Sequence, residues 1–521
     1  MRRALLVTLA LLIVVATFFR GTCLGMVTAI TTRHAFYSIP CAISRLYFDT
    51  GRYVILGDVA EVFMTAHPNI SNETLRQSLF LKPRLDRVML FPADDKGDAD
   101  FVALSFLIFG LNVEALYYMW FLMFVVPIAV FVAVYWRDEF RLATLCVLLL
   151  AVEVGFSALP LTTELFSIHN PRSFGIVSLA SVLHLCFAMI DRQRASAGRL
   201  PAAAMQAAFI AFSIHVRTTE FWQVLCVLGV ASALILRDHS RQAIRTLWPA
   251  LVLVVAVLGL EIYQRASFDP VYGSTHIRHR IFWHNVGIGF ALNPMLARKY
   301  ALAIDDMPMM QLVRRRLIET NRAAEVYEVF RPPGPNEWNY RYYGIAKDFV
   351  RYERVAREVV ASIVWNNKLE ALKTFVVDKP VVLFRELAWA GGYGAHSIDD
   401  LYLTGQATAV ASNRTRRQNG IYLDLFNPWI CAGMIAVVVL GGFGRQREQL
   451  VSSVLALAIC CVSLLPAMVA YPIISALGVS LVTVGFLVLA AFALAVQLLA
   501  TRLYLPRVAP SRPSTVAAVA D

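Results

Sequence analysis

The sequence predicts an all-α polytopic membrane protein, and three observations support this. Of 521 residues, 58% are hydrophobic and only 16% are charged, with a mean hydropathy of +0.59. Soluble domains are about 45–50% apolar and about 25% charged. The apolar residues form long runs, and Lys and Arg gather in alternate connections between them. The composition therefore excludes an ordinary soluble enzyme, a disordered chain, a disulfide scaffold and a nucleic-acid-binding module.

The apolar runs set the predicted number of spans. A membrane helix needs about 20 apolar residues, because lipid satisfies no backbone polar group. About ten runs approach this length, near residues 4–19, 113–136, 142–160, 173–190, 203–217, 221–236, 247–263, 427–443, 450–471 and 475–500. The first run follows Arg2 and Arg3 but precedes no small-residue cleavage site, so we expect an uncleaved span rather than a signal peptide.

The arginines predict the orientation. With the N-terminus in the cytoplasm, every alternate connection is basic, through Arg137, Arg141, Arg192, Arg194, Arg199, Arg237, Arg241, Arg245, Arg445 and Arg447. The short connections on the other side carry only Arg172. The positive-inside rule then places both termini in the cytoplasm. The net charge of +12 thus indicates topology and lipid-headgroup contact rather than nucleic acid.

Four regions follow from this layout. We expect a membrane module over 1–263 with spans one to seven and an outer loop at 20–100. A mostly helical outer, periplasmic segment covers 264–425. A second membrane module covers 426–505, and the Pro/Ala/Ser-rich tail at 506–521 is expected to be disordered. Most of the eight cysteines lie in apolar runs and are read as small core residues, so no disulfide framework is predicted.

Ionisable residues gather on the outer side of this layout. In the first outer loop, Asp58 and Glu61 are three residues apart and would share one face of a helix. The other candidates are Asp94, Asp95, His169, Arg172, Arg217, His284, Asp305 and Asp306. Each has a plainer interpretation: a solvated helix face, a turn, or an arginine that reaches the lipid headgroups. Together they suggest a polar site at the outer ends of the spans.

Such a site could act on a lipid-linked sugar phosphate. A carboxylate can serve as general base for an acceptor hydroxyl, and Arg can hold a phosphate through two hydrogen bonds. The cluster of His276, His279 and His284 matches no zinc spacing. No cofactor is therefore assigned, although a divalent metal ion would be compatible with the chemistry.

The layout resembles the GT-C class of membrane glycosyltransferases. It is similar to the bacterial kind that uses polyprenyl-phosphate sugars, related to the protein mannosyltransferase and aminoarabinose transferase group. The resemblance rests on the acidic first loop at Gly57-Asp58 and Glu61, the stretch Gly97–Tyr118, His215-Val216-Arg217 closing a span, and the large outer segment. It covers residues 1–265 in order, and the later half only in layout.

The resemblance implies roles for particular residues. Asp58 would be the catalytic base with Glu61 beside it, although the family's acidic pair is adjacent and Val59 and Ala60 intervene here. Donor phosphate and lipid would be held by Arg217, Arg172, His169 and His284. The acceptor, or a second acidic site, would be at Asp94, Asp95, Asp305 and Asp306. The expected partners are a polyprenyl-phosphate sugar, a cell-envelope acceptor and membrane lipid, in the bacterial inner membrane.

Two other classes remain open. A transporter or flippase would favour internal repeats and charges near mid-membrane, whereas the chain has no repeat and few such residues, namely Glu114, Glu153 and His184. An O-antigen polymerase or ligase also combines many spans with a large outer loop, and the histidines of 276–284 would suit it. Such an enzyme would not depend on Asp58.

Overall fold

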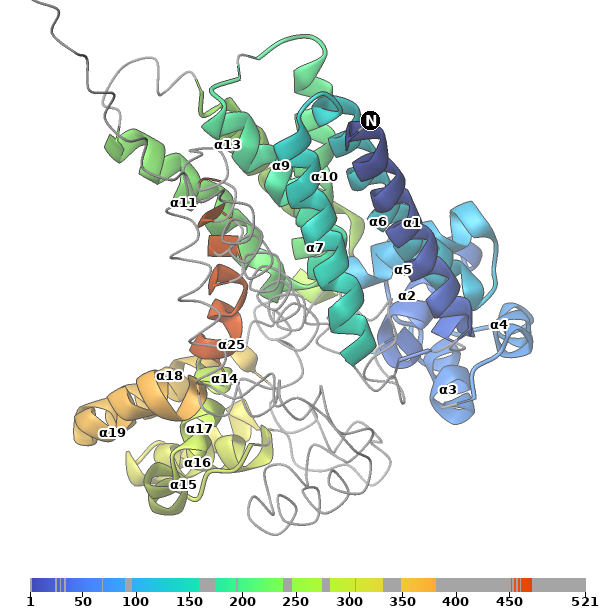
Figure 1. The fold of residues 1–521 in the computed structure, drawn as a ribbon. Coiled ribbons are helices and arrows are strands. Elements are labelled where there is room, and N and C mark those ends of the chain that lie inside the picture. The colour runs from blue at the N-terminus through green and yellow to red at the C-terminus, as the bar shows by residue number, and fades with distance from the viewer. Residues whose placement is uncertain are drawn as a thin grey trace, which may run out of the picture.

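The computed structural model describes most of residues 2–158, 174–237, 246–273, 282–330 and 348–380, with parts of 451–470. Within these ranges the chain is helical, and the only β-type pairing is two isolated bridges, Tyr53 with Phe268 and Leu56 with Val88. The helices form an apolar bundle and a separate helical unit, which lies below the bundle in Figure 1. The prediction of an all-helical protein is thus confirmed for the described residues.

Each of the seven N-terminal apolar runs contains a helix. The bundle helices are α1 (Arg2–Cys23), α6 (Glu114–Tyr135), α7 (Glu139–Ala158), α9 (Leu179–Ile190), α10 (Arg199–Val216), α11 (Trp222–Arg237) and α13 (Trp248–Ser267). Four helices in the described residues are long and apolar enough to cross a bilayer: α6, α10, the run Thr218–Arg237 and α13. This supports a membrane protein. The expected spans at 427–443 and 475–500 lie outside the described residues.

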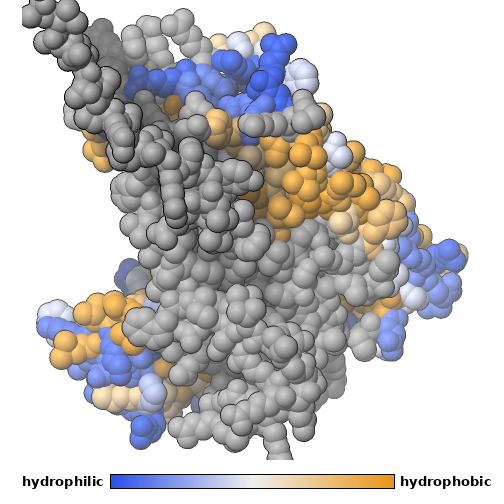
Figure 2. Space-filling view, in the orientation of Figure 1, coloured by the Kyte–Doolittle hydropathy of each residue, from blue (hydrophilic) through white to orange (hydrophobic). Residues whose placement is uncertain are grey.

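The bundle encloses one continuous apolar core. Its largest fully buried side chains include Trp120, Trp222 and Phe124, and the rings of Trp120 and Phe124 stack at 5.4 Å. Hydrophobic side chains also cover the outer surface of the bundle, as Figure 2 shows near α1 and α7. On α13, Leu251, Val255, Leu258 and Ile262 form an exposed stripe at helical spacing. An apolar outer surface is favourable where a helix bundle is surrounded by lipid.

The described part of the long loop between α1 and α6 folds into short helices against the bundle. They are α2 (Ile39–Tyr47), α3 (Gly57–Ala66), α4 (Asn72–Leu79) and α5 (Gly97–Phe109). The side chains of Ser71 and Thr74 cap the start of α4 reciprocally. Asn72 Nδ2 donates to Glu114 Oε2 at 3.1 Å, which fastens α4 to the first turn of α6.

Backbone pairing ties this loop to the end of α13. The Tyr53 N–H donates to the Ser267 carbonyl at 2.8 Å, and the Asp269 N–H donates to the Tyr53 carbonyl at 3.0 Å. The Tyr272 hydroxyl accepts from the Ile55 N–H at 3.0 Å and donates to the Met89 carbonyl at 2.9 Å. The loop is therefore held over the end of the bundle.

The helical unit has its own core. Its helices are α14 (Phe282–Gly289), α15 (Pro294–Tyr300), α16 (Asp306–Glu319), α17 (Ala323–Val329), α18 (Phe349–Asn366) and α19 (Lys368–Lys373). Leu317, Tyr352 and Ile363 are fully buried within it. Glu353 accepts from the N–H groups of Trp283 and His284 at 2.8 and 3.0 Å, which satisfies the start of α14. The described part of 264–425 is thus helical beyond α13.

Candidate functional site

Two buried carboxylates open helix α5. Asp98 and Asp100 lie in its first turn and are 0% and 2% exposed. The free N–H groups and the dipole of a helix N-terminus favour negative charge at this position. The residues that follow, from Phe101 to Phe109, are mostly apolar and bury α5 against α2, α6 and α10. The sequence thus places two charges inside an otherwise apolar environment, where each needs a partner.

Asp100 is enclosed by three other elements. Its Oδ2 lies 2.7 Å from Nε2 of His215, in the last turn of α10. Its Oδ1 accepts from the hydroxyl of Tyr263 on α13 at 3.3 Å and lies 3.8 Å from the guanidinium of Arg45 on α2. A carboxylate, an imidazole, a phenol and a guanidinium therefore converge at this end of the bundle.

Asp98 faces a second set of partners. Residues two apart on a helix point in nearly opposite directions, so Asp98 contacts His34 and Ser38 instead. His34 Nε2 lies 3.2 Å from Asp98 Oδ1, and the Ser38 hydroxyl donates to Oδ2. In a nucleophilic triad the histidine stands between serine and aspartate. Here the aspartate stands between them and the side chains are buried, so this group fastens α5 to the start of α2.

Gly97 permits the close approach of α5 to α10. A Cβ atom at this position would overlap the backbone and ring of His215. The backbone of Gly97 has an ordinary helical conformation, so no special backbone angle requires glycine here. Glycine is required because the backbones of α5 and α10 meet at this position. The contact sets the position of His215 relative to Asp100.

Arg45 covers the Asp100–His215 pair. Its guanidinium lies 4.0 Å from the centre of the Tyr53 ring, a cation–π contact, and its side chain is 29% exposed. Lys96 adds a second cation beside α5 and donates to the Tyr272 carbonyl at 3.1 Å. Burial, and then the charge of Asp100, raise the pKa of the Cys41 thiol well above its ordinary value, so this cysteine is a poor nucleophile.

Asp58 lies apart from this pair, at the start of α3. Its side chain is 22% exposed and accepts from the Arg84 N–H at 2.9 Å and from the Arg87 guanidinium at 2.6 Å. Glu61 shares Arg87 at 3.3 Å, so the expectation of one shared helix face fits. The backbone N–H of Arg84, then Arg87, lower the pKa of Asp58 to about 2. A base of that strength is poorly matched to proton transfer near neutral pH.

The Asp58 cluster gives a stability prediction. Its pKa is about 2 in the folded protein and 3.8 ordinarily, so the unfolded chain binds the proton more tightly. The contribution of Asp58 to stability is present above about pH 4 and is lost as the pH falls towards 2. We expect Asp58→Asn to lower the midpoint of thermal unfolding at pH 6 but not at pH 2. An equal loss at both values would contradict the ion-pair assignment.

The other predicted residues have varied placements. His284 and Asp306 do meet, with Nε2 2.9 Å from Oδ1, while His284 Nδ1 lies 2.5 Å from the Tyr352 hydroxyl. Both imidazole nitrogens are thus engaged inside the helical unit. Arg217 is half-buried at the end of α10, two residues after the Asp100 partner His215. Asp94, Asp95, His169, Arg172 and Asp305 lie outside the described residues.

Three members of the site were not singled out from sequence. Asp100 and Arg45 carried no motif, and Tyr263 looked like part of an apolar span. His215 was noted only as the neighbour of Arg217. One signal was available: two aspartates inside a hydrophobic stretch are costly and therefore point to function. Among the described residues, no group of three or more His, Cys, Asp or Glu is arranged to hold a metal ion.

Comparisons with known proteins add no family. No family model matches the chain, and neither a curated protein nor a solved structure matches it. The function is therefore argued from the site itself.

Proposed function

We propose that the protein is a membrane glycosyltransferase that transfers a sugar from a polyprenyl-phosphate donor to an acceptor hydroxyl. The acceptor would be a glycan, lipid or protein on the outer face of the bacterial cytoplasmic membrane. One observation carries the proposal: a carboxylate–imidazole pair, Asp100 and His215, lies beside Arg45 at the end of an apolar bundle. The apolar bundle suits the polyprenyl chain of the donor. The polar side chains at its end suit the phosphate and the sugar of the donor.

The residues divide between proton transfer and charge. Asp100, held by His215, takes the proton of the acceptor hydroxyl as its oxygen bonds to the anomeric carbon. The bond from that carbon to the phosphate oxygen breaks, and its electron pair leaves with the lipid phosphate. A single displacement inverts the anomeric centre. Fixed cations stabilise the leaving charge, which is the largest contribution in many enzymes, and Arg45 is placed for this role.

The geometry favours Asp100 over Asp58 as the base. Asp58 is bound to two arginines at the surface, whereas the charge of Asp100 is enclosed and aligned with an imidazole. The side chains of Arg45 and Tyr263 form a single layer between Asp100 and the surface. Displacement of these two side chains would admit the acceptor. Arg217, and Arg172 with His169 beyond the described residues, remain proposed phosphate contacts. Asp94, Asp95, Asp305 and Asp306 remain proposed acceptor contacts.

A second candidate is a polymerase-like or ligase-like glycan enzyme. It is favoured by the His284 group, in which Asp306 and Tyr352 align a buried imidazole within the outer helical unit. In that case the chemistry would depend on His284 rather than on Asp100.

Glycan analysis of the host separates these candidates. A deletion strain is complemented with wild type, Asp100→Asn or His284→Gln, and the surface glycans are analysed by mass spectrometry, with protein levels checked by blotting. We expect Asp100→Asn to lose one glycosyl modification and His284→Gln to keep it. Loss only in His284→Gln would support the polymerase-like enzyme. Unchanged glycans in the deletion strain would reject both and favour a transporter.

A further inference from the structure

A pocket of about 1020 Å³ runs along α11, from Leu225 near the start of this helix to Arg237 at its end. Its charged end lies where α9 ends at Ile190 and α11 ends at Arg237, whereas His215 lies in the last turn of α10. Its walls are α11 and the described residues of 451–462. The volume is at the upper end of the range of about 300–1,000 Å³ for small-molecule sites, so the pocket has room for a large occupant.

The walls of the pocket are apolar along most of their length. From α11 they include Cys226, Gly229, Val230 and Ala233, which share one face of the helix. From Leu225 to Arg237 the helix rises about 18 Å, at 1.5 Å per residue, which is more than half of the roughly 30 Å hydrocarbon core. The opposite wall is formed by Val454, Leu455, Ala458, Ile459 and other residues of that segment. A groove of this length and lining fits a hydrocarbon chain.

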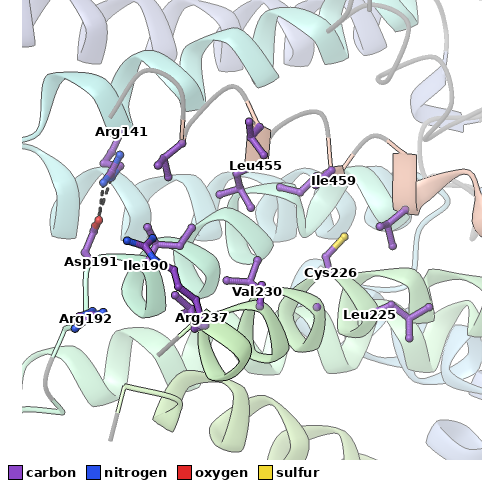
Figure 3. Close-up of a pocket in the computed structure, with 17 residues that line it drawn as sticks. Arg141, Ile190, Asp191, Arg192, Leu225, Cys226, Val230, Arg237, Leu455 and Ile459 are labelled. Atoms are coloured by element: carbon purple, nitrogen blue, oxygen red, sulfur yellow. Dashed lines mark hydrogen bonds and ion pairs between the residues drawn. The ribbon is translucent and has the colours of Figure 1, made fainter. Parts of the chain in front are cut away.

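Charged side chains gather at one end of the groove (Figure 3). Arg141 donates to Asp191 at 2.5 Å and lies over the Phe187 ring, so Asp191 balances its charge. Arg192 and Arg237 lie beside this pair. Arg192 has a left-handed backbone (φ 51°) just after the end of α9, a conformation in which non-glycine residues are uncommon. Asp138 lies 3.7 Å from Arg141 as a second carboxylate. With three arginines and two aspartates, this end has an excess of positive charge.

We propose that this groove binds an anionic phospholipid, with its phosphate at Arg192 and Arg237 and an acyl chain along α11. The charge complements a phosphate and the length complements a chain, and a phospholipid combines both features. The phosphate would bind apart from the site of sugar transfer, because the charged end of the groove lies by the connection before α10, whereas His215 lies in the last turn of α10. Arginine holds phosphate through paired hydrogen bonds, and the excess of positive charge favours an anionic headgroup over a zwitterionic one that carries the same phosphate.

Gly229 provides a sharp test. A Cβ atom at Gly229 would meet nothing within 4 Å, and Gly229 lines the pocket, so a larger side chain would occupy part of the groove. Gly259 on α13 also has open space around it but does not line the pocket. Gly229→Leu should therefore block the lipid, and Gly259→Leu is its matched control. Arg192→Ala combined with Arg237→Ala tests the headgroup contacts separately.

The full chain is reconstituted in nanodiscs of phosphatidylglycerol and phosphatidylcholine, and the lipids that it retains are counted by native mass spectrometry. We expect wild type to retain phosphatidylglycerol in preference to phosphatidylcholine. Gly229→Leu and the double arginine variant should each lower retention about tenfold or more, while Gly259→Leu retains the lipid. Thermal unfolding verifies that each variant is folded.

Three results would overturn the proposal. Equal retention of phosphatidylcholine would remove the role of charge. Unchanged retention in Gly229→Leu would place the chain elsewhere. The third result is that no phospholipid is retained, while inorganic phosphate binds as tightly to Gly229→Leu as to wild type. It would indicate a site for free phosphate rather than for a lipid. Failure of sugar transfer would leave this test unaffected, because it measures lipid retention only.

Discussion

Asp100→Asn is expected to lower the rate of sugar transfer by about 10²–10⁴-fold, the usual contribution of a general acid–base group. The substitution keeps the shape of the side chain and its place between His215 and Tyr263, but the amide cannot take a proton. The measurement is release of lipid phosphate from a synthetic polyprenyl-phosphate hexose in proteoliposomes that contain extract of the host envelope as acceptor.

Asp58→Asn is the matched control for Asp100→Asn. It removes a carboxylate from the same part of the chain, between α1 and α6, but one that is paired with Arg84 and Arg87 at the surface. We expect it to retain most of the transfer rate. Full activity in Asp100→Asn together with loss of activity in Asp58→Asn would show that Asp58, and not Asp100, is the base. Thermal unfolding of both variants separates a loss of chemistry from a loss of fold.

Gly97→Ala is expected to reduce both stability and transfer. The added methyl group would overlap the backbone of His215, and neither backbone can yield as a flexible side chain can. Overpacking of this kind costs about 1–3 kcal/mol. The displaced imidazole would also lose its 2.7 Å contact with Asp100. Thermal unfolding in detergent and the transfer assay measure the two effects.

Gly259→Ala provides the comparison for Gly97→Ala. A methyl group there would meet nothing within 4 Å, and alanine favours a helix interior over glycine by about 1 kcal/mol. We therefore expect unchanged or slightly raised stability and full transfer. Equal behaviour of the two variants would show that the approach of α5 to α10 is looser than the structure indicates.

The bundle could be predicted from sequence because membrane helices are encoded locally. A run such as 247–263 is apolar over a span's length, and the structure places α13 at Trp248–Ser267. The short helices of the first loop were harder to predict from the sequence. Two of them, α2 and α3, are stabilised by contacts with other elements, which hydropathy does not record. The residues of the last spans lie mainly outside the described ranges, so their number stays a prediction.

The site was harder to predict than the spans. Asp100 meets residues that are 55 positions before it and 115 and 163 positions after it, and no spacing rule joins Arg45, His215 and Tyr263. Asp58 looked stronger because an acidic first loop was expected from the resemblance. Its arginine partners, Arg84 and Arg87, lie beyond a further helix, α4. His284 and Asp306 were both predicted as site residues from the sequence. Their contact inside one helical unit could not be predicted from it.

The pairing of Tyr53 with Ser267 and Asp269 has a consequence for biosynthesis. The ribosome makes Tyr53 more than 200 residues before Ser267, its partner at the end of α13. Chains are made from the N-terminus and their parts fold as they emerge, so the first loop must wait for this partner while several later helices are made. Arg45 and Asp100 are therefore brought together with Tyr263 late, and a chain that stops before residue 263 lacks one wall of the site.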